Sequence, residues 1–201
     1  MTDPTPEQQT EQLALAVATV DAGRLLQWLS PTDSLAIACY ALGEIAAYRP
    51  PEGVALDERA EILIGVAKFT ADGLVGTPYA RPAEGTNPLA RTLPDGEMSD
   101  SEASDDGAWA ENFIDMNLSI GLLPLGSTML TAELMLHYVA RGDELDVNDR
   151  MGDNKLGLAP LASPPETRAA AQAVLANHLM AMQAAAPYFA ATSGAVETPT
   201  A

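Results

Sequence analysis

The sequence predicts an all-α fold: a compact bundle of five or six helices, with a long acidic loop between the third and fourth helices. Two observations predict it. Apolar residues recur at intervals of three and four positions along most of the chain, which is the spacing of a helix with one apolar face. No stretch of useful length alternates as a β-strand does. We expect one helical domain over residues 7–191, since 201 residues are ample for a single core.

Three helices are predicted before residue 74, behind a mobile tail at residues 1–6. The first covers 7–22, where Gly23 interrupts it, and has a short continuation ending at Ser30-Pro31. The second is capped by Thr32, Asp33 or Ser34 and stopped by Arg49-Pro50-Pro51, and the third runs from about residue 56 to Asp72. The expected inward face of the first helix is Leu13, Ala16, Val17 and Val20. That of the second is Leu35, Ala38, Leu42 and Ile45, and that of the third is Ile62, Val66 and Phe69. The solvated face of the third helix is Glu58, Glu61, Gly65, Lys68 and Asp72.

A long irregular segment at 74–107 follows, rich in proline and glycine. Between Thr92 and Ala140 there is no lysine or arginine but there are nine acidic residues. The low-complexity part at 95–106 is typical of a solvated linker. Loops of this length are also often functional, so the composition leaves both interpretations open.

Three more helices are predicted in the second half of the chain. A stripe of Trp109, Phe113, Met116 and Ile120 predicts a helix ending at Pro124-Leu-Gly126, and these side chains are candidate binding residues. The next helix, capped by Ser127 or Thr128 and ending at Ala140, has Glu133 as its one formally charged residue and should be the central helix. The last helix begins at Ser163-Pro-Pro-Glu166, ends at Pro187 and points Leu175, Leu179 and Met182 inward, and a mobile tail follows at 192–201.

The charge of the chain restricts its partners. A net charge of -18 and the lack of a basic patch argue against nucleic acids and anionic membranes. Nothing at the N-terminus is typical of a targeting segment, so we expect a cytoplasmic protein. The single cysteine, Cys39, excludes an internal disulfide framework and should be buried. Eight arginines against two lysines are typical of a GC-rich genome, such as that of an actinobacterium or its phage.

Two segments of the sequence are candidates for metal binding. The loop at 143–153 fails the EF-hand pattern in either register, because Arg150 or Val147 occupies a ligand position. Glu58-Arg-Ala-Glu61 resembles the Glu-x-x-Glu pair of the all-α nucleotide pyrophosphohydrolases of the MazG and dimeric dUTPase type, which would imply Mg²⁺ bound against a nucleotide. The second pair of that family is not matched, because Glu111 and Asp115 are separated by three residues. A solvated helix face explains Glu58 and Glu61 without chemistry. We predict no metal and no cofactor.

Histidine gives the remaining candidate site. Glu133 and His137 are one helical turn apart and can pair along one face, as a general base with its orienting carboxylate or as a satisfied polar pair. His178 on the last helix is placed to approach them, and His178 and Leu134 are further candidate binding residues.

The first functional expectation is a non-catalytic binding or assembly protein, a homo-oligomer or a protein that docks a partner through apolar helix surface. The alternative is a small all-α enzyme or ligand-binding protein that uses the Glu133–His137 pair in a pocket lined by methionine and leucine. The third functional expectation is a carboxylate site like that of the nucleotide pyrophosphohydrolases.

Overall fold

The computed structural model describes residues 5–77, 79, 114, 122–141 and 163–193. Within these ranges the chain is helical, without a strand, so the predicted all-α bundle is confirmed. The helices are α1 (Pro6–Trp28), α2 (Pro31–Ala47), α3 (Glu58–Asp72), α5 (Leu122–Arg141) and α7 (Pro165–Ser193). Most of the predicted acidic loop, nearly all of both tails and the loop at 143–153 lie outside the described residues.

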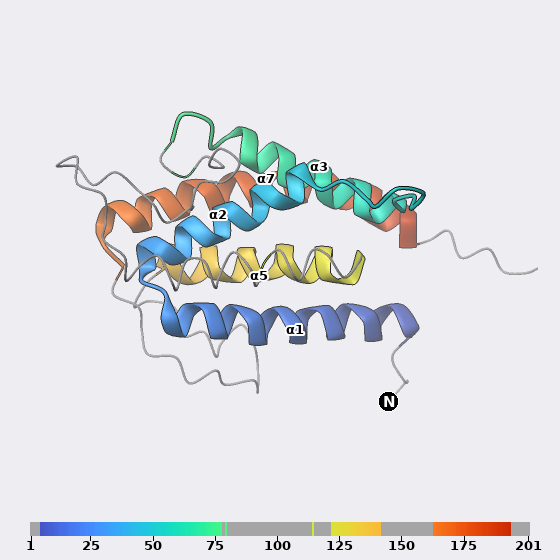
Figure 1. Cartoon of the computed structure of the whole chain (residues 1–201), viewed down its shortest axis with the longest axis horizontal. Helices are drawn as coiled ribbons and strands as arrows, with labels where there is room; N and C mark the ends of the chain where they lie inside the picture. Colours follow the sequence, from blue (N-terminus) through green and yellow to red (C-terminus); the bar gives the residue numbers. More distant parts are fainter. Residues whose placement is uncertain (1–4, 78, 80–113, 115–121, 142–162, 194–201) are drawn as a thin grey trace, which may run out of the picture.

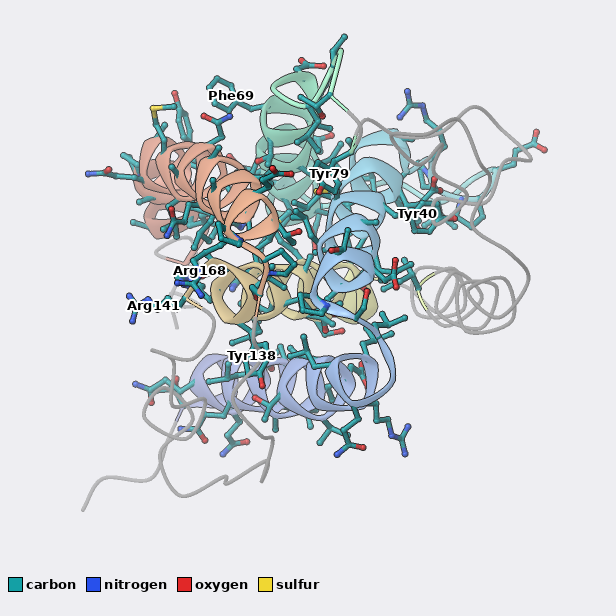
Figure 2. All side chains as sticks on the ribbon, turned by 90° about the vertical axis from the view of Figure 1, so that its left-hand side faces the viewer. Tyr40, Phe69, Tyr79, Tyr138, Arg141 and Arg168 are labelled. Atoms are coloured by element: carbon teal, nitrogen blue, oxygen red, sulfur yellow. The ribbon has the colours of Figure 1, made fainter. Side chains whose placement is uncertain are left out.

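Helix α5 lies at the centre of the bundle, as its apolar sequence predicts. It packs against α1, α2 and α7 and more lightly against α3. In the end-on view α1 lies on one side of α5, while α7, α3 and α2 form an arc around its other side (Figure 2). The inner residues of α5 are fully buried: Leu125, Met129, Ala132, Met135, Leu136 and Val139. An apolar helix enclosed on most sides in this way forms the core of an α-helical protein.

Helix α1 is continuous through Gly23, so the predicted interruption is wrong. Thr5 and Gln8 form a capping box at its start, with each side chain bonded to the backbone of the other residue. A single glycine costs a helix only about 1 kcal/mol. Burial of Ala22, Leu25 and neighbouring residues against the core offsets that cost.

The predicted apolar face of α1 is also wrong. Leu13 and Val20 are exposed, whereas the side chains that face the core begin at Ala18. The buried stripe is Ala18, Ala22, Leu25, Leu26 and Leu29. Its first two members are alanines, which give a weaker hydrophobic signal in the sequence than Leu13 and Val20. Figure 1 shows α1 as the outermost layer beside α5.

Helix α2 begins earlier than predicted. Ser30 is its N-cap and accepts a hydrogen bond from the Asp33 backbone, and Pro31 occupies the first helical position. Proline suits that position because its missing N–H would be unpaired there anyway. The predicted inward face is confirmed, since all four of its residues are buried, and Cys39 is buried and unbridged as expected.

Helix α3 has the predicted solvated face, and each of its five residues is exposed. The expected inward position of Phe69 is wrong, because this ring is exposed and lies on the outer side of α3 (Figure 2). The residues buried instead are Ala60, Val66, Ala67 and Thr70. Small side chains on that side allow α2 and α7 to pack closely on α3.

The predicted start of α5 and the predicted end of α7 are wrong. Helix α5 begins at Leu122, so Pro124 lies in its first turn, where a missing N–H is tolerated, and Ser127 and Thr128 are buried within the helix instead of capping it. Helix α7 continues past Pro187 to Ser193. Its last turns are held to α3 by Arg59, whose guanidinium lies 5.9 Å from the centre of the Phe189 ring.

Leu179 on α7 is exposed, so its predicted inward position is wrong, whereas Leu175 is buried. Its neighbour His178 is turned into the core in its place. None of the helices that the structure describes has the length and apolar character needed to cross a membrane.

Candidate functional site

Glu133, His137 and His178 meet in the centre of the bundle, and we call them the Glu–His cluster. Glu133 and His137 are one turn apart on α5, and Nε2 of His137 lies 3.5 Å from Oε1 of Glu133. From α7, Nε2 of His178 lies 3.7 Å from Oε2 of the same carboxylate. The pairing expected along α5 is therefore present, and packing of α7 adds the second imidazole.

The three members of the Glu–His cluster differ in their access to solvent. His178 is 0% exposed and His137 is 3% exposed, whereas the side chain of Glu133 retains 18% exposure. Glu133 is therefore the member of the cluster with the greatest solvent exposure.

Thr70 of α3 adds a hydroxyl behind His178. Its Oγ1 donates to the carbonyl oxygen of Val66, at 3.0 Å, and lies 3.4 Å from Nδ1 of His178. Thr70 is fully buried, so water does not compete for these contacts. The cluster is thus built from three helices, α3, α5 and α7.

The surroundings of Glu133 set its acidity. Burial raises its pKa, but the two neighbouring histidines outweigh burial through direct contacts and charge, and they lower the pKa to about 2. Both contacts are longer than the about 2.7–2.9 Å of a charge-assisted hydrogen bond. The carboxylate thus lies near both rings without a short hydrogen bond to either, and it stays ionised at neutral pH.

The imidazole nitrogens retain unused hydrogen-bonding capacity. Within the described residues, Nδ1 and Nε2 of His137 and Nε2 of His178 are buried and have no partner at hydrogen-bond distance. Buried polar groups are usually paired, and an unpaired one costs about 1–3 kcal/mol. Both Nε2 atoms still face the Glu133 carboxylate at 3.5 and 3.7 Å, so among the described residues Nδ1 of His137 is the ring nitrogen left without a polar contact.

Of the other predicted site residues, Leu134 is the one that the structure describes. Leu134 is half-buried on α5 and packs against the core. Trp109, Phe113 and Met116 lie outside the described residues, as do Glu111 and Asp115 of the carboxylate hypothesis.

Glu58 and Glu61 are exposed on the outer face of α3. In the described part of the chain, no three His, Cys, Asp or Glu side chains are arranged to hold a metal ion.

Thr70 is the member of this site that sequence reasoning missed. It lies 108 positions from His178, and a threonine on a helix face carries no local signal of such a contact. No family model, characterised protein or solved structure was found to match the chain.

Proposed function

We propose that this chain is a helical binding protein that holds a cationic or hydrogen-bond-donating group at the carboxylate of Glu133. The observation that carries this proposal is the convergence of two buried imidazoles on one ionised, partly exposed carboxylate. Fixed side chains behind a charged group keep it in one position before the ligand arrives, which lowers the cost of binding. The net charge of -18 also attracts cations to the molecule.

The same features favour binding over proton abstraction. A carboxylate whose pKa is about 2 is a weak base at neutral pH. His137 is 3% exposed, so its ring is not placed to meet a substrate from solvent. A general base must lie within hydrogen-bonding reach of the proton that it removes.

Titration with small cations tests the proposal. The probes are butylamine and agmatine, an amine and a guanidinium compound, followed by NMR shifts of the histidine rings. We expect saturable shifts at His137 and His178 in the native protein and in Glu61→Gln, which neutralises an exposed carboxylate on α3. Glu133→Gln should abolish them. Equal shifts in all three proteins would contradict the proposal, because they would show only nonspecific attraction of cations by the net charge.

A second candidate function, self-association through an apolar helix face, rests on a different observation. Leu13, Ala16, Val17 and Val20 form one stripe along α1, and each is exposed or half-buried. We call these residues the α1 stripe. Apolar side chains gathered on an outer face are typical of a surface that a partner covers. A second copy of the chain, meeting it across a two-fold axis, is the simplest such partner.

Light scattering tests the assembly candidate. We expect the native chain to be a dimer and Leu13→Asp with Val20→Asp to be a monomer, because charges on the α1 stripe oppose its burial. Leu15→Asp is the matched control: Leu15 is exposed on the same helix, but it points to another side. A monomeric native chain, or a dimer that survives the double substitution, would contradict this candidate.

A further inference from the structure

Large apolar side chains are exposed on α3 and α7 as well as on α1. Phe69 and Met180 are each 53% exposed, and Tyr188 is 63% exposed. We call these three residues the α3–α7 patch. In Figure 2 the ring of Phe69 lies on the outer side of α3, and α1 lies across the bundle from it. The α3–α7 patch is therefore separate from the α1 stripe.

Two contacts show how α3 and α7 run beside each other. Near the end of α3, a Cβ atom at Gly73 would lie 2.9 Å from the Asn177 side chain of α7. Near the start of α3, the guanidinium of Arg59 lies 5.9 Å from the centre of the Phe189 ring. Residue numbers therefore fall along α3 as they rise along α7, so the two helices pack side by side and antiparallel.

Helical spacing then places the members of the α3–α7 patch along the line where these two helices meet. Phe69 is one turn before Gly73 and shares its face of α3. Met180 and Tyr188 follow Asn177 by three and eleven positions, or about one and three turns, so they share its face of α7. The three exposed side chains therefore border one surface that both helices form.

Small residues separate the two ends of this surface. Gly65 is one turn before Phe69 on α3, and a Cβ atom there would meet nothing within 4 Å. Ala184 is one turn after Met180 on α7 and is exposed. In the antiparallel pair both lie between Phe69 and Tyr188. The surface therefore has large apolar side chains at its ends and small residues in its middle, where side chains of a partner can be accommodated.

The charges beside the α3–α7 patch indicate the sign of its partner. From residue 169 to 193, α7 has no aspartate, glutamate, lysine or arginine. The exposed charges of α3 are three acids and two bases: Glu58, Glu61, Asp72, Arg59 and Lys68. Arg59 already lies over an α7 ring, so acids predominate at the border of an uncharged apolar face. The net charge of -18 attracts basic partners to the molecule as a whole.

We infer that the α3–α7 patch docks a basic amphipathic helix of a partner protein. Its apolar side chains cover Phe69, Met180 and Tyr188, and its lysines and arginines face the acids of α3. Apolar anchors at intervals of three and four residues bind helix surfaces in this way. Eight residues of α7 rise about 12 Å, so a partner helix of about three turns spans the patch. The inference depends neither on the binding proposed at Glu133 nor on assembly through the α1 stripe.

NMR of the methionine methyl groups, with a defined peptide, tests the inference on the intact chain. The probe is a synthetic peptide of leucine and lysine, about 14 residues long and patterned as an amphipathic helix. We expect a saturable shift of the Met180 methyl, whereas the methyls of the buried Met129 and Met135 stay in place. A peptide of the same composition, reordered so that no apolar face forms, should leave Met180 unchanged.

Substitutions at exposed positions separate this surface from general attraction to the chain. Phe69→Ser should weaken the affinity for the patterned peptide about tenfold, because it removes an apolar anchor. Leu13→Ser is the matched control, since Leu13 is also 53% exposed but lies on α1. It should leave the affinity unchanged. Tyr188→Ser supplies a second variant, on α7, if serine at position 69 impairs folding.

Three results would overturn the inference. One is a patterned peptide that binds without moving the Met180 methyl, or does not bind. Another is an equal loss of affinity in Leu13→Ser and Phe69→Ser, because the peptide would then attach to any exposed apolar side chain. The third is a Met180 shift that follows the concentration of the chain alone, because a second copy would then cover the patch.

Discussion

At the scale of a single residue, Glu133 links the stability of the bundle to pH. Its pKa is about 2 in the folded chain and 4.5 for the free group. A lowered pKa stabilises the folded state fully above pH 4.5, and this stabilisation is lost as pH falls toward 2. The difference corresponds to roughly 3 kcal/mol.

Urea unfolding of the native chain and of Glu133→Gln measures this contribution. We expect the native chain to be more stable by roughly 3 kcal/mol at neutral pH, with the advantage shrinking as pH falls below 4.5. Glu61→Gln is the control, because this exposed carboxylate should change stability by no more than about 0.5 kcal/mol. A difference between the native chain and Glu133→Gln that stays constant over the same pH range would contradict the assignment.

At the scale of the helix, Gly65 within α3 and Gly73 at its C-cap differ in the space around them. A Cβ atom at Gly65 would meet nothing within 4 Å, so Gly65→Ala should stabilise the chain by about 0.5–1 kcal/mol through helix propensity. At Gly73 a Cβ would lie 2.9 Å from Nδ2 of Asn177 on α7 and 3.3 Å from the carbonyl oxygen of Thr70. Gly73→Ala should therefore destabilise the chain by roughly 1–3 kcal/mol. Thermal melting of both variants checks the difference in sign.

Two leucines distinguish the central helix from the outermost one. Leu136 of α5 is 0% exposed and Leu13 of α1 is 53% exposed. Leu136→Ala should cost about 2–5 kcal/mol because it leaves a cavity in the core. Leu13→Ala should change the stability of a monomer by no more than about 0.5 kcal/mol. Chemical unfolding at a concentration where the chain is monomeric measures both, and similar losses would contradict the central position of α5.

At the scale of the whole molecule, the net charge of -18 opposes the folded state. Self-repulsion among acidic groups is stronger when the chain is compact, and salt screens it. Added sodium chloride should therefore raise the melting temperature at neutral pH. Near the isoelectric point, about pH 4.1, the effect should disappear because the repulsion itself is gone. An equal response to salt at both pH values would assign it to another cause.

The sequence predicted the strongly periodic parts of this fold and missed parts that depend on close approach of helices. Leu35 and Ile45 have large apolar side chains at helical spacing, and this pattern correctly predicted that both are buried. In α1 the buried stripe starts with alanines, so hydrophobicity favoured Leu13 instead. Pro124 was misread because it lies in the first turn of α5, where a missing N–H is tolerated, and Pro187 because α7 continues through it.

The candidate site divides in the same way. Glu133 and His137 are one turn apart, so their proximity can be read from the sequence. The contact of His178 with them depends on how α7 packs on α5, and that of Thr70 depends on how α3 packs on α7. Spacing along the chain carries no information about such packing.

The two ends of α1 differ in how firmly they are held, and the difference should appear in amide hydrogen exchange. In residues 8–17 each described side chain is exposed or half-buried, and full burial begins at Ala18. Fraying from the N-terminus therefore exposes little apolar surface until it reaches that residue. We expect the backbone amides in the first half of α1 to exchange for deuterium while those of α5 remain protected. The 23 residues of α1 would then behave as two segments. The first half would exchange through local fraying, and the second half only when the core itself unfolds.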